Sequence, residues 1–282
     1  MLMPLNAVVE KEFLDSVRSS SLLGLTALFV AFAGFLAAIQ WVPNLTTSDS
    51  VSTSTLALLN SMKQPTVVFV PMIALGIGYD TVAGERERGS LKLMLGLPNR
   101  RRDVVFGKFI GRTAVVGVAV LVGYVTVGVI ALLTYDSFDA VMFGTYTLLT
   151  VCYGAVYIAI AVGISAAARS RARALGGVVA MYALVMLLWD ALLYALQLLV
   201  FGAQPPEGGL PAWFDLIGVL NPSTAFMFAA RAVIPEYYEL TVYPESDAFY
   251  LQDWVGFVVL AVWAVVPLVL GYWRFENADY TQ

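Results

Sequence analysis

Long apolar runs dominate this chain and constrain its fold more than any other feature of the sequence. They cover residues 22–42, 65–83, 113–135, 140–168, 174–201 and 254–273. Four of the six contain no charged residue, whereas the second includes Asp80 and the fifth includes Asp190. A helix needs about 20 apolar residues to cross a bilayer, so each run can span it. The sequence therefore predicts an all-α polytopic membrane protein with six transmembrane helices in a single domain, residues 1–282.

The composition excludes most soluble and catalytic classes of protein. Hydrophobic residues make up 60% of the chain and charged residues 13%, whereas about 25% of the residues in a typical soluble domain are charged. The chain has no histidine and a single cysteine, Cys152, which removes the usual catalytic triad, any internal disulfide and the common zinc and copper ligands. No G-x-x-x-x-G-K-[ST] phosphate-binding loop occurs. We expect no catalytic residue, no bound metal or cofactor, and no nucleic-acid partner for this chain.

The distribution of positive charge predicts the orientation in the membrane. With six spans, every Lys and Arg except Lys63 and Arg231 lies on one side. The positive-inside rule makes that side cytoplasmic, which places both termini in the cytoplasm of a multi-pass plasma-membrane protein. Within residues 1–21, apolar side chains recur at every fourth position. This spacing predicts an interfacial helix on the inner leaflet, and a solvated lead-in to the first span is the alternative.

The most informative polar segment is the loop of residues 84–112, which carries half of the sixteen Lys and Arg. In this loop, Leu91, Met94 and Leu95 follow i, i+3, i+4 spacing, which predicts a short helix with one apolar face. Leucines exposed to the cytosol are costly unless something covers them, so we interpret this helix as a docking site for a soluble partner. The alternative is a solvated basic loop whose leucines rest on the bilayer. The predicted docking residues are Glu85, Arg86, Glu87, Arg88, Leu91, Met94, Leu95 and Leu97.

Two further features stand out within the apolar segments. Asp190 lies near the middle of the fifth run, where a carboxylate costs about 2.5–3.5 kcal/mol and is usually turned toward protein or water. It is a candidate pathway residue, and a hydrogen-bonded contact between helices, for example with a tyrosine, is the alternative. Residues 216–234 are apolar but interrupted by Asn221 and Pro222. Because proline removes a donor and disfavours helix before it, we expect a pair of short helices or a re-entrant element there, with a candidate gate at its break.

The loop of residues 84–112 resembles the loop after the second span in permeases of the type-2 (ABC-2) exporter family. The family pattern begins G-E-x-E-x-G-[ST]-L, continues through a leucine and a proline, and ends in a basic R-x-x-x-x-x-K. The six-span layout and the interrupted segment before the last span also agree with that family. Within it, the chain resembles the copper-processing and nitrous-oxide-reductase maturation permeases. The matching positions are Gly84, Glu85, Glu87, Gly89, Ser90, Leu91, Leu95, Pro98, Arg102 and Lys108.

The resemblance implies a non-enzymatic permease subunit of an ATP-driven ABC exporter. It further implies a separate cytoplasmic ABC ATPase that binds ATP and Mg²⁺, a second permease copy in a homodimer, a coupling helix in the loop of residues 84–112, and an outer gate after the fifth span. The alternative function is a non-transporting membrane scaffold or assembly factor that recruits a cytoplasmic partner. An ion-coupled carrier would show internal repeats and several mid-membrane charges. A membrane-embedded enzyme would need acids and bases within reach of each other, and the sequence favours neither class.

Overall fold

The computed structural model describes residues 54–91, 101–203, 206, 209–241 and 248–277, together with the single positions 9, 14, 27 and 31. Within these ranges every regular element is a helix, which confirms the all-α class. Five of the described helices are long and apolar enough to cross a membrane, or six if one bent pair counts as a span. The predicted first span, residues 22–42, and the predicted interfacial helix lie outside the described residues, apart from the four single positions.

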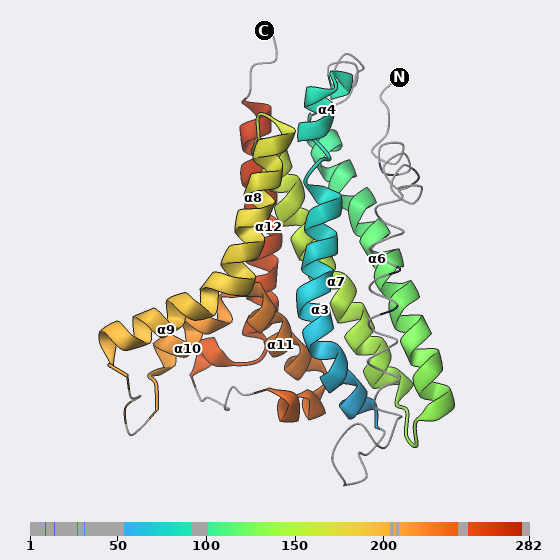
Figure 1. Ribbon diagram of the computed structural model, residues 1–282, viewed down its shortest axis with the longest axis vertical. Helices are drawn as coiled ribbons and strands as arrows, with labels where there is room; N and C mark the ends of the chain where they lie inside the picture. The colour runs from blue at the N-terminus through green and yellow to red at the C-terminus, as the bar shows by residue number, and fades with distance from the viewer. Residues whose placement is uncertain are drawn as a thin grey trace.

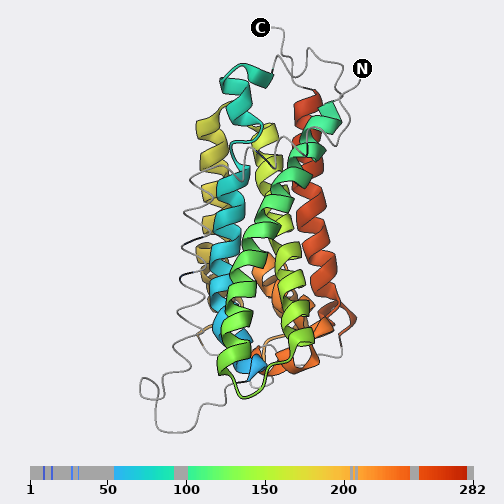
Figure 2. The ribbon, with the colours of Figure 1, turned by 90° about the vertical axis from the view of Figure 1, so that its right-hand side faces the viewer.

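One uncharged helix forms the centre of the bundle, and three long helices pack around it (Figures 1 and 2). In the central helix, 72% of the most apolar 18-residue stretch is buried. A Cβ added at Gly163 of this helix would lie 2.2 Å from the carbonyl oxygen of Pro267, so the absence of a side chain lets two helix backbones touch. The central helix is α7 (Ala140–Ala167), and its neighbours are α3 (Thr55–Gly78), α6 (Arg101–Thr134) and α12 (Val255–Glu276).

Two of the predicted spans begin earlier than the apolar runs do. Helix α3 starts at Thr55 rather than at residue 65, because Ser54 caps it by accepting the backbone N–H of Ala57 at 3.2 Å, and Leu58 packs in the core. Helix α6 starts at Arg101 rather than at residue 113, so that its basic first turns continue directly into the apolar span. Polarity marked these segments as loops, but a polar segment can be helical when one face packs against the bundle. The predicted fourth and sixth spans agree with α7 and α12 to within three residues.

The predicted fifth span, residues 174–201, is a continuous helix that bends at a π-helical turn. It consists of α8 (Arg171–Ala183), the π-helical turn η1 (Leu184–Leu188) and α9 (Trp189–Val200). Figure 1 shows α8 beside the bundle and α9 leaving it toward the lower left. Only 6% of the most apolar 18-residue stretch of this span is buried. A π turn is a known cause of helix bending, and here it directs the second half of the span away from α7.

The interrupted segment at residues 216–234 forms two short helices, as predicted. These are α10 (Ala212–Val219) and α11 (Pro222–Val233), which meet at an angle of 101°. Asn221 accepts the backbone N–H of Ser223 at 2.8 Å and caps α11, and Pro222 occupies the first helical position, where its missing N–H is not needed. We call α10, α11 and the residues between them the helical hairpin.

The helical hairpin packs closely on the last span. A Cβ added at Gly256 of α12 would lie 2.4 Å from the carbonyl oxygen of Ala225 in α11, so this glycine permits the close approach. Two 3₁₀ segments complete the same end of the bundle: η2 (Pro235–Leu240) and η3 (Phe249–Leu251).

Candidate functional site

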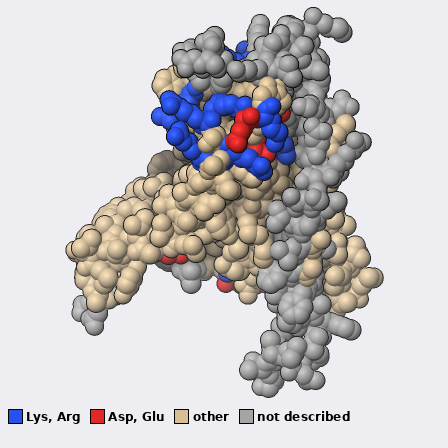
Figure 3. All heavy atoms as spheres, turned by 45° about the horizontal axis from the view of Figure 1, so that its top comes forward, with Lys and Arg blue, Asp and Glu red and all other residues tan. Residues whose placement is uncertain are grey.

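Positive charge collects at one end of the bundle, which we call the basic end (Figure 3). The short helix α4 (Ala83–Glu87) lies there, directly after α3, and the start of α6 reaches the same end beside the end of α12 (Figures 1 and 2). The α7–α8 connection and the last turn of α12 reach the same end. The basic residues of the described chain at this end are Arg86, Arg88, Arg101, Arg102, Lys108, Arg112, Arg169, Arg171, Arg173 and Arg274.

Glu85 and Lys108 form a buried ion pair that joins α4 to α6. The Lys108 Nζ lies 2.9 Å from Glu85 Oε1, and the two side chains are only 1% and 11% exposed, respectively. Lys108 lies on the same face of α6 as the buried residues Val104 and Gly111. Removing one partner of a buried pair leaves an uncompensated charge, so this contact fixes the position of α4 relative to α6.

A second set of contacts joins α4 to the end of α7. The backbone N–H groups of Val82 and the next residue both donate to the Ser165 hydroxyl, at 3.1 and 3.0 Å. The Arg86 guanidinium donates to the carbonyl of Ala166 at 3.3 Å and to that of Ala168. Carbonyls at a helix C-terminus lack partners within the helix, so Arg86 caps α7 as well as anchoring α4.

The start of α8 is joined to the same region. Arg171 donates its backbone N–H to Glu87 Oε2 at 3.0 Å, and its Nε lies 3.1 Å from Asp80 Oδ1. Arg88 Nη1 lies 3.3 Å from the other oxygen of Asp80. Asp80 therefore sits between α4 and α8 and bridges two arginines rather than standing alone within the apolar run.

The last turn of α12 completes the basic end. Arg101, the first residue of α6, donates to the backbone carbonyls of Phe275 and Glu276 at 3.0 and 2.5 Å. The guanidinium of Arg86 lies 6.0 Å from the centre of the Phe275 ring, at the outer limit of a cation–π contact. Helices α6, α7 and α8 thus contact α4 or the residue before it, and α12 contacts Arg86 of α4 and Arg101 of α6.

The structure places the predicted docking residues on two sides of this cluster. Glu87 and Arg88 are exposed, and Arg86 is half-buried. Glu85 and Leu91 instead point inward, and Leu91 is 1% exposed within the main hydrophobic core. Leu91 therefore needs no partner to cover it, and the docking role stays a prediction for the residues that remain. Three of the predicted docking residues lie outside the described part of the chain: Met94, Leu95 and Leu97.

Asp190, the candidate pathway residue, lies in the first turn of α9 and is exposed. Among the residues that the structure describes, none forms a hydrogen bond or an ion pair with its carboxylate. The interhelical tyrosine contact considered as the alternative is therefore not made within this part of the chain. The exposed carboxylate lies on the span that the bundle covers least.

Buried hydroxyl groups form a separate polar network inside the bundle. Tyr124 Oη lies 2.5 Å from the Thr66 hydroxyl and 3.2 Å from the Thr150 hydroxyl. Both threonine hydroxyls also donate to carbonyls of their own helices, that of Met62 at 2.7 Å and that of Tyr146 at 2.9 Å. The network joins α3, α6 and α7, and each hydroxyl in it has a partner.

The end opposite the basic end has its own buried ion pair. Arg231 of α11 places Nε 3.0 Å from Asp253 Oδ1, with its side chain only 4% exposed. The guanidinium also lies 4.7 Å from the centre of the Tyr238 ring. Burial raises the pKa of the nearby Tyr237 hydroxyl, so this phenol stays protonated. These contacts hold the helical hairpin and η2 to the start of α12.

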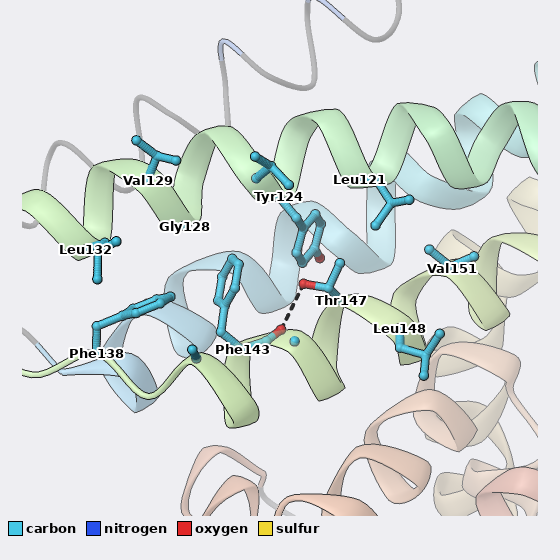
Figure 4. Close-up of a pocket in the computed structure, with 13 residues that line it drawn as sticks. Leu121, Tyr124, Gly128, Val129, Leu132, Phe138, Phe143, Thr147, Leu148 and Val151 are labelled. Atoms are coloured by element: carbon cyan, nitrogen blue, oxygen red, sulfur yellow. Dashed lines mark hydrogen bonds between the residues drawn. The ribbon is translucent and has the colours of Figure 1, made fainter.

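An apolar groove of about 470 Å³ lies between α6 and α7 (Figure 4). Leu121, Leu132, Phe143 and Leu148 are among the side chains that line it. The Thr147 hydroxyl at the groove donates to the Phe143 carbonyl at 2.8 Å, the bond drawn as a dashed line. The groove thus offers contacts to apolar groups and no arrangement for a polar ligand. Within the described ranges, no group of three or more Cys, Asp or Glu side chains is placed to hold a metal ion.

Sequence reasoning did not single out Lys108 as a buried partner or Ser165, Arg171, Trp189 and Trp263 as contact residues. For Lys108 a signal existed, because it lies four residues after Val104 and three before Gly111, on the face of α6 that carries apolar and small residues. For Ser165, Trp189 and Trp263, nearly all neighbouring helix positions are apolar, so periodicity could not identify their contacts. Arg171 lies in a basic turn, and the sequence does not show which acids it meets.

These features define a class: a polytopic helical membrane protein whose spans converge on one short charged helix. Comparison with known proteins gives the family. The model described as "ABC-2 family transporter protein" matches residues 6–280, so the chain belongs to the ABC-2 transporter family. This result confirms the resemblance identified in the loop of residues 84–112.

Two curated relatives extend over nearly the whole chain. Both are named "Probable ABC transporter permease protein NosY". The protein of Pseudomonas aeruginosa is 28% identical over 280 residues, which cover 96% of this chain and 97% of the relative. The protein of Stutzerimonas stutzeri is 27% identical over 272 residues, which cover 92% of this chain and 96% of the relative. The present chain is accordingly a membrane permease of the ABC transporter type, with several apolar spans.

Proposed function

We propose that this chain is the permease subunit of an ATP-driven exporter and that a separate cytoplasmic ABC ATPase docks on α4 and the loop after it. The observation that carries the proposal is that several spans are attached around α4. Helices α6, α7 and α8 bond to α4 or to the residue before it, and the end of α12 contacts Arg86 of α4 and Arg101 of α6. A displacement of α4 would reach four spans at once. ATP and Mg²⁺ would bind to the ATPase, because this chain has no phosphate-binding loop.

The direction of force follows from the contacts at the basic end. The positive-inside rule makes this end cytoplasmic, with both chain termini on that side. The Glu85–Lys108 pair would pass a push on α4 to α6, and Ser165 and Arg86 would pass it to the end of α7. The exposed face of Glu87 and Arg88 is left for the ATPase, together with the predicted helix that follows.

A second copy of the chain is supported by the span from α8 to α9. It is almost uncovered, and it carries the exposed Asp190 between exposed apolar side chains such as Leu187 and Leu192. A carboxylate at membrane depth is turned toward protein or water rather than lipid. A homodimer formed on this face would cover the apolar side chains and would place both Asp190 carboxylates along a path between the two copies.

The docking test uses the full chain coexpressed with candidate ABC ATPases. Met94→Asp combined with Leu95→Asp should abolish copurification, while Leu91 is left intact because it belongs to the core. Arg173→Asp is the control, since it reverses an exposed charge at the basic end outside the docking loop. Equal recovery of the ATPase with the wild-type chain, the double variant and the Arg173→Asp control would reject docking at this loop.

Vesicles reconstituted with the complex separate an exporter from a scaffold. For an exporter, ATP hydrolysis depends on the loop and drives net movement of a substrate. Asp190→Asn should then lower transport at least about 10-fold while the complex still assembles, because a pathway carboxylate at membrane depth has lost its charge. Unchanged transport would remove Asp190 from the path. A complex that assembles but transports none of the substrates tried, copper ions included, would favour the scaffold.

A further inference from the structure

The break between α10 and α11 lies well along the last span, although it belongs to a connection between spans. The carbonyl of Leu220, at the break, accepts a hydrogen bond from Trp263 Nε1 at 2.8 Å. Trp263 lies eight residues after the start of α12, which corresponds to a depth of about 12 Å along that helix. We call residues 217–223 the hairpin tip.

The hairpin tip contacts the π-helical turn of the fifth span through Asn221. The Asn221 amide donates to the carbonyl of Val185 at 2.9 Å, and both residues are buried. Val185 lies in η1, halfway along the span. A switch from i→i+4 to i→i+5 bonding disturbs the backbone ladder, and a carbonyl freed there needs another donor at membrane depth. Asn221 supplies that donor while its own oxygen caps α11.

Three more side chains hold the same tip from different helices. Trp189, the first residue of α9, donates its Nε1 to the Ile217 carbonyl at 3.2 Å. The Tyr153 hydroxyl of α7 lies 3.0 Å from the Ser223 hydroxyl. With Trp263, these contacts join the tip to α7, α9 and α12. Among the residues that the structure describes, Asn221 is the one whose side chain bonds to the backbone of η1.

We propose that Asn221 is a positioning residue that latches the π-helical turn of the fifth span and thereby sets the orientation of α9. A π turn that reverts to α-helix rotates the residues beyond it by about 100° about the helix axis for each residue of register. Asp190 lies two residues beyond η1, so it turns with α9. The hairpin and the outer half of the span move together while the latch is closed.

The consequence for transport rests on the proposed exporter function. In the latched state Asp190 is exposed on the span that the bundle covers least, and the proposed second copy would lie against this face. Release of Asn221 from Val185 frees η1 and lets Asp190 leave that face. The latch therefore couples the position of the hairpin to the orientation of the candidate pathway residue.

Hydrogen exchange followed by mass spectrometry tests the latch on the purified full chain in lipid nanodiscs, without ATPase or nucleotide. Asn221→Ser keeps a side-chain acceptor for the cap of α11 but is too short to reach Val185. Trp263→Phe is the matched control, because it removes one hydrogen bond of similar length from the α12 side of the same tip.

The expected result is selective. Hydrogen bonds between membrane helices change equilibria by about 3- to 20-fold, so Asn221→Ser should speed exchange at residues 184–190 by that factor. Exchange within α11 should stay unchanged, and Trp263→Phe should alter residues 184–190 by less than about 2-fold. No change in Asn221→Ser, or an equal change in both variants, overturns the latch.

A second measurement keeps this proposal separate from the exporter proposal. In reconstituted complexes, Asn221→Ser should preserve ATP hydrolysis and lower transport per ATP, whereas Trp263→Phe should alter neither by more than about 2-fold. If the wild-type chain transports nothing, the exporter function falls, yet the exchange result still decides whether Asn221 holds η1. If transport per ATP is the same in Asn221→Ser and wild type, the role of the latch in orienting Asp190 is wrong.

Discussion

The basic end and the hairpin tip are both points where several helices meet, but they are held by different chemistry. At the basic end, α4 is attached mainly through charged side chains: the Glu85–Lys108 pair, Arg86 on helix-terminal carbonyls, and Asp80 between two arginines. At the hairpin tip, neutral groups of Asn221 and two tryptophans donate to backbone carbonyls. The physical reason is depth, because a charge costs little near water and about 2.5–3.5 kcal/mol in mid-membrane.

This difference indicates how the contacts of the basic end and of the hairpin tip can be broken. Ion pairs at the membrane surface can be broken or re-formed by a charged partner, which suits a docking site. Neutral hydrogen bonds within the membrane are insensitive to salt and to such partners. They break only when the helices themselves shift. Substitutions at two charged contacts of the basic end and at two neutral contacts inside the bundle distinguish these two kinds of attachment, and the largest effect is expected at Lys108.

Lys108→Met should lower the free energy of unfolding by about 3–5 kcal/mol, because it leaves the buried Glu85 without this ammonium. Denaturation by SDS in mixed micelles measures the change. The double variant Glu85→Gln with Lys108→Met is the control and should recover most of the loss. A loss below about 1 kcal/mol in the single variant would mean that the pair does not hold α4 to α6.

Gly163→Ala should cost about 1–3 kcal/mol of unfolding free energy, since its Cβ would overlap the Pro267 carbonyl of α12. Gly144→Ala on the same helix is the matched control, because no atom lies within 4 Å of the added Cβ. The control should be neutral or up to about 1 kcal/mol more stable, as alanine favours helix over glycine. Equal effects of the two substitutions would contradict the close α7–α12 contact.

Tyr124→Phe should cost about 0.6–1.7 kcal/mol, the range measured for hydrogen bonds between membrane helices. The loss stays small because the hydroxyls of Thr66 and Thr150 keep their bonds to backbone carbonyls. The same SDS titration measures it, and the cost should not change with salt. A cost that falls at high salt would show that the hydroxyl network acts through charge.

Arg88→Ala should have the smallest effect, below about 0.5 kcal/mol, because the guanidinium side chain is 59% exposed and its pair with Asp80 is solvated. The difference from the wild-type protein should vanish at 1 M salt, where screening acts over about 3 Å. A large effect that persists in salt would place this pair with the buried contacts of the basic end.

Some of the fold and site could be predicted from the sequence, and particular residues show why. The ends of α7 and α12, and the break at Asn221, followed from apolar length and from the backbone restriction of proline. The loop pattern identified the ABC-2 family. The burial of Leu91 and Glu85 was not predicted, because i, i+3, i+4 spacing defines a helix face but not which neighbour it meets. The π turn at residues 184–188 could not be predicted from hydrophobic periodicity, since every position in it is hydrophobic.

By itself, then, the sequence determined the membrane class, the location of the charged loop and the family to which the chain belongs. These properties depend on local composition, length and motif, which are written directly along the chain. The tertiary structure alone decided that Lys108 turns inward to Glu85, that Arg171 and Arg88 share Asp80, and that Asn221 reaches η1. Such contacts join segments far apart in sequence, and only the packing of the helices brings their side chains within bonding distance.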